Sequence, residues 1–508
     1  MNAILNNKVF TAPMLWTAGE AEAITNGIST QQWVASGVAA SSQSVTAGDL
    51  YIHLDMYDEV GIIEAMRKGA SAIIVEAVPE KFQRKIPFLI VEDAYKALLD
   101  LAAIARLRAE NMHTIAITGS VGKSCVRSML GTALNRQGVV HSAQSAHLST
   151  HLSLALSLAN THPNSKFGLY ELGIERFGES FAFAQQTKPS IAIVTNVFET
   201  THDHFSSLEE MTKEFCNIFE TMDHEGTVIA NADCPHYPTL VAAARTKGIR
   251  RVWGFGGSRH AHARLIDIVD HAATNGRHGQ KVTLEILGER LVVFLPLEGR
   301  HMVDNLLATL LGVLATGASL SYAVKNIEKI HEINGRGKRR SFALSDNMNP
   351  VTVIDETLHF CPISIEKSLL QLAKQSIGSG GRKIVILGDL PDLPDKGADI
   401  FETIETLLDF AGVHAVYTVS PDTHPYLGKN HFASYKDLVK ELPEIIRDGD
   451  TILVKGNINN QLWHVLKALE KMQFDHQAQR NNAEKASNQA ISDMPSHLWR
   501  LASTANDG

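Results

Sequence analysis

The sequence predicts an α/β protein of several domains, and three observations carry that prediction. The chain has 508 residues, which is too long for one hydrophobic core and favours two to four domains. From His113 onward, short apolar segments alternate with helical ones, as in parallel sheets covered on both faces. The alternation restarts after residues 334–337, so a second α/β unit follows the first.

The first 110 residues are expected to form an N-terminal domain of mixed strands and helices. Residues 48–53 and 70–76 are apolar and predict two strands. Residues 59–68, between them, have the periodicity of an amphipathic helix.

A central domain is expected at residues 111–335. Its predicted strands are residues 113–117, 167–171, 190–195, 227–230 and 250–254. Residues 281–297 predict a β-hairpin with Gly288 and Glu289 at its turn, and residues 305–316 predict an apolar helix.

A C-terminal α/β domain is expected at residues 336–473. Its predicted strands are residues 351–355, 383–387, 415–419 and 451–455. Residues 474–508 form a polar tail rich in Gln, Asn, Ala and Ser. With little to bury, this tail is expected to be loosely ordered.

Composition and charge exclude several functional classes. Hydrophobic residues make up 44% and charged residues 20%, which is typical of soluble globular proteins. The net charge of −8 offers no basic footprint, so we expect no nucleic-acid partner. We see neither a signal peptide nor a membrane span. The four cysteines show no CxxC pair and predict reduced thiols, so we expect a cytoplasmic protein. We also expect a monomer.

The strongest chemical signal lies where the first central strand meets its helix, at residues 115–124, Ile-Ala-Ile-Thr-Gly-Ser-Val-Gly-Lys-Ser. Gly119 and Gly122 would let backbone N–H groups approach phosphate oxygens. Lys123 would meet the β- and γ-phosphates, and the Ser124 hydroxyl is a natural Mg²⁺ ligand. The helix would point its positive end at the same anion. The loop predicts ATP and Mg²⁺; the alternative is a glycine turn without a ligand.

A second candidate metal site lies at His202 and His204, which flank Asp203. The alternating spacing matches no standard zinc motif, so solvated loop histidines are the alternative.

Residues 118–124, Thr-Gly-Ser-Val-Gly-Lys-Ser, are similar to the TGxxGK[ST] loop of the Mur ligase family. Further segments resemble family motifs in the same order across residues 14–470. They are residues 15–21, 45–51, 171–179, 231–233, 299–305, 334–336, 354–356, 387–389 and 453–456. The resemblance is strongest to the MurF branch, which adds D-alanyl-D-alanine to a UDP-linked muramyl tripeptide.

The resemblance implies three domains: an N-terminal substrate-binding domain, a central P-loop ATPase and a C-terminal Rossmann-like domain. It implies that ATP phosphorylates a carboxylate, and that an amine then displaces the phosphate. The substrates it implies are a UDP-muramyl peptide and D-Ala-D-Ala, with ATP and Mg²⁺ as cofactors.

The resemblance also implies roles for individual residues. Lys123, Glu171 and His202 would be catalytic, and Ser124, Glu171 and His202 would hold metal. The nucleotide-binding set would be Thr118, Gly119, Ser120, Val121, Gly122, Lys123, Ser124, His301, Asn305, Arg336 and Asp355. The alternatives are a plain strand-end carboxylate for Glu171, helix capping for His301 and Asn305, and a surface arginine for Arg336.

Several positions depart from the family pattern. The family's carbamylated lysine falls on Phe215, and Lys213, two residues earlier, would point about 200° away on a helix. The family's histidine falls on Thr201, with His202 adjacent. In the C-terminal domain, the family's tyrosine and two asparagines are missing from residues 355–362. The substrate-facing residues 41–44 and 149–150 have also changed.

These departures leave several functions open. The first is a peptidoglycan-type ligase that joins a UDP-linked peptide to a dipeptide. The second is a paralogue that runs the same chemistry on a non-murein carboxylate and amine. The third is a degenerate nucleotide-binding module without ligase activity. A P-loop transport or motor ATPase is disfavoured by the C-terminal α/β domain.

Overall fold

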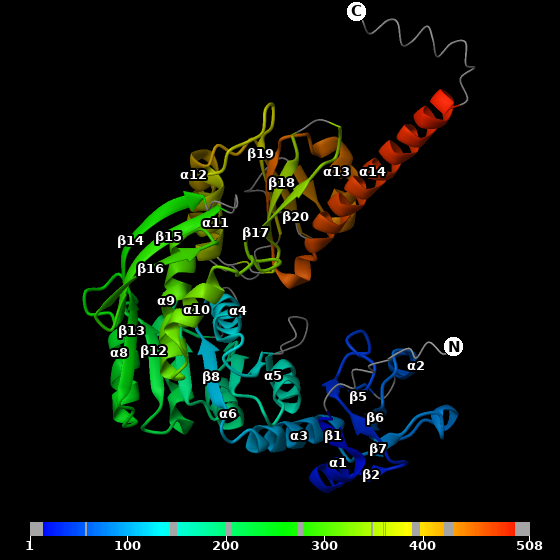
Figure 1. Ribbon diagram of the computed structural model, residues 1–508, viewed down its shortest axis with the longest axis vertical. Helices are drawn as coiled ribbons and strands as arrows, with labels where there is room; N and C mark the ends of the chain where they lie inside the picture. The colour runs from blue at the N-terminus through cyan, green and yellow to red at the C-terminus, as the bar shows by residue number, and fades with distance from the viewer. Residues whose placement is uncertain are drawn as a thin grey trace, which may run out of the picture. The chain divides into compact units, whose positions relative to one another are not determined.

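The computed structural model describes residues 14–55, 58–142, 150–198, 205–272, 278–346, 349–358, 360, 362–388, 397–420 and 430–492. The chain divides into two compact units, one ending at His331 and the other beginning at Glu332. Three main sheets of five, nine and six strands carry the architecture (Figure 1), and the predicted α/β class is confirmed. The predicted domain boundaries themselves stay predictions.

The N-terminal sheet has the order β2-β7-β6-β5-β4. Its strands are Ile28–Ser29, Phe88–Ile90, Ala72–Val75, Asp49–Ile52 and Gly37–Ala39. Strands β4 to β7 are parallel and β2 is antiparallel to β7. The remaining elements are β1 (Trp16–Thr17), α1 (Ala18–Thr25), β3 (Val34–Ala35), α2 (Glu59–Arg67), a 3₁₀ turn at Glu80–Phe82 and α3 (Ala94–Arg108). Both predicted strands and the predicted helix are confirmed.

The central sheet has nine strands in the order β16-β15-β14-β13-β12-β11-β8-β10-β9. Their bounds are β8 His113–Thr118, β9 Val140–His141, β10 Phe167–Glu171, β11 Ile191–Val194, β12 Thr227–Asn231, β13 Arg251–Gly256, β14 Ala263–Ala272, β15 His278–Ile286 and β16 Glu289–Leu295. The strands from β9 to β14 are parallel, as predicted, while β14, β15 and β16 pair antiparallel.

Helices α4 to α8 connect successive central strands, and α9 and α10 follow the last one, β16. They are α4 Lys123–Leu134, α5 Thr150–Ala159, α6 Glu179–Thr187, α7 Leu208–Cys216, α8 Tyr237–Thr246, α9 Arg300–Ala315 and α10 Leu320–Ile327, with a 3₁₀ turn at Asn217–Thr221. The predicted apolar helix at residues 305–316 is therefore the later part of a longer helix, α9.

The predicted hairpin forms, but its turn lies one residue earlier than expected. Ile286 pairs with Glu289, so Leu287 and Gly288 make the turn, with φ of 48° and 90°. Positive φ at both central positions is what the twist of a two-residue hairpin favours. Strand β14, which was not predicted, extends the hairpin to three strands.

The N-terminal and central sheets share one hydrophobic core. A single cluster of buried side chains runs from Trp16 and Leu98 to Leu154 and Tyr170. The Trp16 indole Nε1 donates to the Ala159 carbonyl over 3.0 Å. The Asn160 side chain accepts from Val38 N and donates to Val38 O, each at 2.8 Å. The first unit is therefore one folded body.

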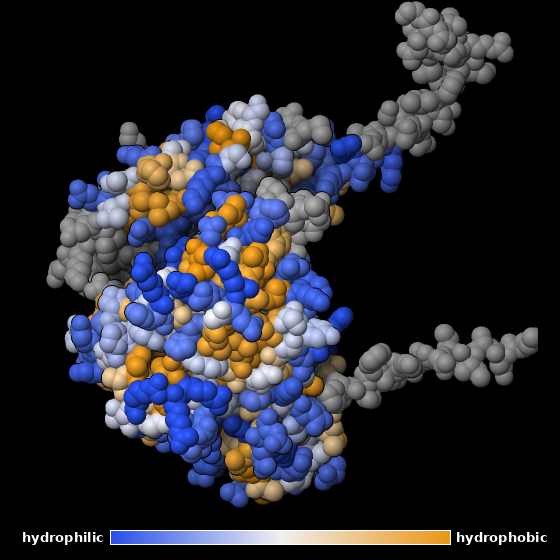
Figure 2. Space-filling model, turned by 60° about the vertical axis from the view of Figure 1, so that its left-hand side comes forward, coloured by the Kyte–Doolittle hydropathy of each residue, from blue (hydrophilic) through white to orange (hydrophobic). Residues whose placement is uncertain are grey.

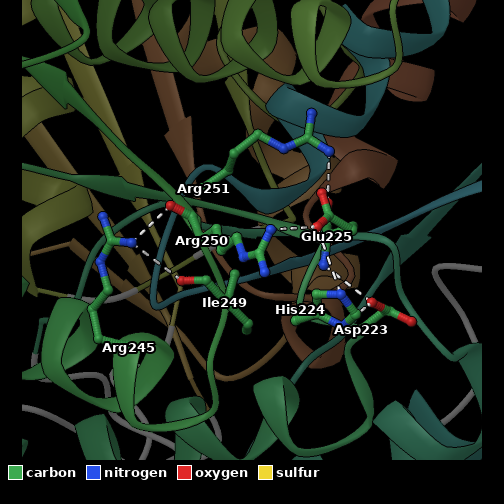
Figure 3. Close-up of polar contacts among 7 residues, drawn as sticks. All are labelled: Asp223, His224, Glu225, Arg245, Ile249, Arg250 and Arg251. Carbon is green, nitrogen blue, oxygen red and sulfur yellow. Dashed lines mark hydrogen bonds and ion pairs between the residues drawn. The ribbon is translucent and has the colours of Figure 1, made fainter.

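A surface cluster of charged residues ties the amino ends of β12 and β13 together (Figure 3). Arg250 Nη1 lies 3.1 Å from Glu225 Oε1, and Arg251 Nη2 donates to the Glu225 carbonyl over 2.6 Å. Arg245 Nη1 donates to the Arg250 carbonyl over 2.7 Å. Since β8 is parallel to these strands, the loop at its carboxyl end lies at the opposite edge of the sheet.

The second unit contains the six-stranded sheet, in the order β17-β18-β22-β19-β20-β21. Its strands are Lys338–Phe342, Val351–Glu356, Thr451–Lys455, Lys383–Leu387, Ala415–Val419 and Asn430–Phe432. All are parallel except β17, and the four predicted strands are confirmed. The helices are α11 Pro362–Ala373, α12 Gly397–Phe410, α13 Tyr435–Ile445 and α14 Trp463–Ser492, with a 3₁₀ turn at Ile458–Asn460.

The expectation of a loosely ordered tail is wrong for its first part. Helix α14 continues without a break to Ser492. The helix is held on its sheet by an ion pair between Glu470 and Arg340 and by the Gln473 side chain, which accepts from Ala343 N over 3.2 Å. Ala, Gln, Glu, Lys and Arg, which are good helix formers, recur beyond this docked part, so the helix propagates.

The surface is mixed in character. Figure 2 shows one face, on which hydrophilic residues surround separate hydrophobic patches. Among the described residues, none of the helices combines the length and apolar character that a bilayer crossing demands. Phe177 and Phe181 are exposed by 57% and 43%, and both follow the carboxyl end of β10.

Candidate active site

The glycine loop follows β8, an interior strand of its sheet, at the strand's carboxyl end. Gly119 has φ of 124° and Gly122 has φ of 91°, a region that side chains rarely adopt. A Cβ at Gly119 would lie 2.2 Å from Thr195 Oγ1, and one at Gly122 would lie 2.6 Å from Asn305 Oδ1. Both glycines are therefore required by conformation and by space.

The loop is fixed by the strand beside it, β11, and the residues after that strand. Thr195 Oγ1 donates to the Val121 carbonyl over 2.7 Å. The Asn196 side chain accepts from Val121 N and donates to Val121 O, each at 3.0 Å. Ser120 Oγ donates to the Phe198 carbonyl over 2.8 Å and accepts from Phe198 N. A loop anchored in this way keeps its shape before any ligand arrives.

The positive charge of the loop comes from a side chain and a helix end. Lys123 Nζ donates to the Gly119 carbonyl over 2.6 Å and to the Ser120 carbonyl over 3.3 Å, so the ammonium lies over the loop. Helix α4 begins at Lys123, and its N-cap, Gly122, gives no side-chain cap to the first N–H groups. These groups and the helix dipole favour an anion.

Oxygen ligands gather beside this positive end. Ser124 Oγ donates to Glu171 Oε1 over 2.6 Å, which brings the loop to the carboxyl end of β10. Arg127 Nε lies 3.3 Å from Glu171 Oε2, and Arg127 Nη1 donates to the Ser142 carbonyl over 2.9 Å. Mg²⁺ is typically held by one or two carboxylates together with phosphate oxygens. The hydroxyl and carboxylate next to a phosphate loop fit this ion.

The segment between β10 and α6 is shaped by Glu179. Its Oε2 accepts from Glu175 N over 2.8 Å and Arg176 N over 3.0 Å, and its Oε1 lies 3.1 Å from His151 Nε2. Burial raises the pKa of Glu179, but the two amides and His151 outweigh it, so the net shift is downward. Glu179 therefore orders the loop that follows Glu171.

Buried apolar side chains of α7, here called the apolar wall, pack next to the phosphate loop. Phe215 is 2% exposed and belongs to the shared core with Met211, whose Sδ lies 3.7 Å from Ser120 Oγ. Lys213 is exposed, as the helical spacing predicted. Glu214, between them, is fully buried and accepts from Ser180 N over 2.9 Å, at the start of α6. Its carboxylate is used to cap that helix.

The structure places the remaining predicted residues as follows. Asn305, on α9, is 7% exposed and lies against Gly122, while the His301 ring lies over Gly299. Asp355 belongs to the second unit and is 5% exposed.

Asp355 uses both of its oxygens within the second unit. Its Oδ2 accepts from Gly335 N over 2.8 Å and its Oδ1 from Thr357 Oγ1 over 2.8 Å. Arg336, in the same turn, donates its backbone N–H to the Ile333 carbonyl. His202 lies outside the described residues.

Comparison with known proteins places this arrangement in a family. The model of the Mur ligase middle domain matches residues 117–313, which include the glycine loop, β10 and most of α9. A relative from Rickettsia prowazekii, UDP-N-acetylmuramoyl-tripeptide–D-alanyl-D-alanine ligase, is 27% identical over 433 residues, covering 83% of this chain and 92% of that protein.

Residues 117–313 belong to the Mur ligase family as its middle domain, and the similarity to Mur ligases extends over most of the chain. The enzyme class of this chain is the Mur-type ATP-dependent ligase. The Escherichia coli protein of the same description is 25% identical over 446 residues, covering 85% of this chain and 93% of that protein.

Solved Mur ligase structures share the fold. MurF from Acinetobacter baumannii superimposes with a TM-score of 0.72 at 20% identity, covering 91% of this chain and 99% of that one. MurF from Thermotoga maritima, solved in complex with ADP, gives 0.65 at 20% identity, covering 86% and 98%. The predicted three-domain Mur ligase fold is thereby confirmed.

Proposed function

We propose that this Mur ligase uses ATP and Mg²⁺ to phosphorylate a carboxylate and then joins the acyl group to an amine. The observation that carries the proposal is the 2.6 Å hydrogen bond between Ser124 and Glu171, which joins the phosphate loop to an acidic strand end. Open α/β sheets bind ligands at this edge.

The reaction needs charge stabilisation more than a covalent nucleophile. A substrate carboxylate oxygen attacks the γ-phosphorus and ADP leaves, which gives an acyl phosphate. The amine nitrogen then attacks the acyl carbon, phosphate leaves, and the amine loses a proton. Lys123 and the first N–H groups of α4 would balance the negative charge on the phosphoryl oxygens. Mg²⁺, held by Ser124 and Glu171, would neutralise further phosphate charge.

The substrates we propose first are a UDP-linked muramyl tripeptide and D-Ala-D-Ala. The proposal is supported by relatives of that description, which match over more than four fifths of this chain. In the same proposal, the enzyme acts in the cytoplasm, His202 adds a metal ligand, and His301, Asn305, Arg336 and Asp355 contact the nucleotide.

A second candidate is ligation of a carboxylate that carries no nucleotide. The N-terminal loop in which the family recognises the nucleotide part of its substrate contains Ser42 here, whose hydroxyl donates to Glu64 Oε2 over 2.5 Å. Lys68 Nζ is engaged by the carbonyls of Ser42 and Gln43. These contacts engage the Ser42 hydroxyl and the Lys68 ammonium within the protein, which favours a substrate without a diphosphate at this place.

The test is phosphate release by the full-length protein with ATP, Mg²⁺, the UDP-muramyl tripeptide and D-Ala-D-Ala, omitting each in turn. Release that needs both substrates supports the first candidate. ADP binding without release on murein precursors favours the second candidate or a module without ligase activity. Lys123→Ala should abolish release, while Lys213→Ala, at an exposed lysine, should leave it unchanged. Full activity of Lys123→Ala would exclude both ligase candidates.

A further inference from the structure

Arg127 lies one helical turn after Lys123 and Ser124 on α4, and its side chain is 22% exposed. Its guanidinium contacts two different elements. Nε lies 3.3 Å from Glu171 Oε2 at the end of β10. Nη1 donates to the Ser142 carbonyl over 2.9 Å and lies 3.3 Å from Ser142 Oγ, just after β9. Arg127 therefore bridges three segments beside the phosphate loop.

The two oxygens of Glu171 contact different side chains. Oε1 accepts from the Ser124 hydroxyl and Oε2 faces Arg127. A carboxylate with one contact can rotate about its last bond, whereas contacts on both oxygens fix its plane. The guanidinium is itself planar and is anchored at its other end by Ser142, so its orientation is defined.

We propose that Arg127 is a positioning residue for Glu171. It holds Oε2, so that Oε1 and the Ser124 hydroxyl form the pair of oxygens offered to Mg²⁺ at the phosphate loop. The inference rests on the proposed function, which assigns Mg²⁺ to Ser124 and Glu171. Partners that orient a metal ligand typically change metal affinity by 10- to 100-fold when they are lost, on the order of what we expect here.

The experiment compares ADP affinity with and without Mg²⁺ by calorimetry on the full-length protein. Arg127→Met should reduce the Mg²⁺ enhancement of ADP binding by about tenfold or more, while ADP affinity in EDTA stays within about twofold. Arg127→Lys should recover part of the enhancement, because it keeps the charge but not the planar fork.

Arg250→Met is the matched control. It removes another arginine–glutamate pair of the same unit, with a 3.1 Å contact to Glu225, at the opposite edge of the sheet (Figure 3). This variant should leave ADP binding and its Mg²⁺ dependence unchanged.

The outcomes separate the possible roles. An unchanged Mg²⁺ enhancement in Arg127→Met, with or without a lower melting temperature, overturns the inference and leaves only a structural ion pair. A larger enhancement also overturns it, because Arg127 would then compete with the metal for Glu171. Failure of the unaltered protein to bind ADP overturns the proposed function itself, which is a different result.

Discussion

The imidazole of His141 is buried in β9 against Tyr170, with its Nε2 3.2 Å from the Ser157 hydroxyl. Burial lowers the pKa of His141 from 6.5 to about 4. Below pH 6.5 the unfolded chain takes up a proton that the folded chain excludes until about pH 4. Stability from this residue is therefore complete above pH 6.5 and is lost as the pH falls towards 4.

We expect His141→Gln to remove this part of the pH dependence. A shift from 6.5 to about 4 corresponds to roughly 3 kcal/mol between neutral pH and pH 4. Urea unfolding at pH 7 and pH 5 should show a smaller loss of unfolding free energy in the variant than in the unaltered protein. Equal losses in the two proteins would show that His141 is already protonated in the folded protein at pH 5.

Phe215→Lys tests whether the apolar wall is a lost metal site. The side chain is 2% exposed, so we expect the variant to lose about 3–5 kcal/mol from the missing ring, and more from an unpaired ammonium. Phosphate release should not increase. Lys213→Ala, on the exposed face of the same helix, should change stability by about 0.5 kcal/mol or less. Increased release by Phe215→Lys would show instead that the site can still use a lysine at this position.

Among single residues, the sequence predicted those site residues that follow one another directly in the chain. Residues 118–124 carry the phosphate signal in seven consecutive positions. Thr195 and Asn196 were missed because only the pairing of β11 with β8, which sets Val194 beside Thr118, brings them to the loop. The one available signal was a polar pair at the end of an apolar strand. The roles proposed for individual site residues stay predictions.

At the scale of elements, two glycines at helix N-caps share a backbone conformation but differ in the space around them. Gly122 has φ 91° and ψ −12°, and Gly178 has φ 85° and ψ −13°. A Cβ would be 2.6 Å from Asn305 Oδ1 at Gly122, whereas at Gly178 it would meet no atom within 4 Å.

We therefore expect Gly122→Ala and Gly178→Ala to pay a similar backbone penalty of about 1–2 kcal/mol. Only Gly122→Ala should also displace Asn305 and weaken ADP binding, by about tenfold if the displacement costs about 1.4 kcal/mol. Melting temperature reports the shared penalty and calorimetry with ADP reports the difference. Similar ADP affinities in the two variants would show that Asn305 does not contribute to nucleotide binding.

The regular elements were predictable when their hydrophobic pattern was undisturbed. The four strands of the C-terminal sheet are apolar runs and were found. Strand β14 was missed because its register shifts between Leu265 and Asp267, which interrupts the two-residue alternation. The polar end of α14 was missed because composition alone does not reveal that a docked segment precedes it.

At the scale of the whole molecule, the shared core makes the N-terminal and central sheets of the first unit unfold together. Trp16 is fully buried in that core and lies under Arg108, 4.4 Å from its guanidinium. We expect Trp16→Ala to cost about 3–5 kcal/mol and to accelerate amide hydrogen exchange in β5 to β7 and in β10 alike. Phe342→Ala, in the core of the second unit, should accelerate exchange in that unit. Faster exchange confined to β5–β7 in Trp16→Ala would contradict a common core.

The pairing of Asn160 with Val38 has a consequence for behaviour in concentrated solution. Strand β4 is the last strand of its sheet, and an open strand of this kind offers unpaired amides and carbonyls to another chain. Here a side-chain amide occupies the N–H and C=O of Val38 as a neighbouring strand would. The end of α5 thereby blocks intermolecular strand addition at this point and protects the sheet against aggregation.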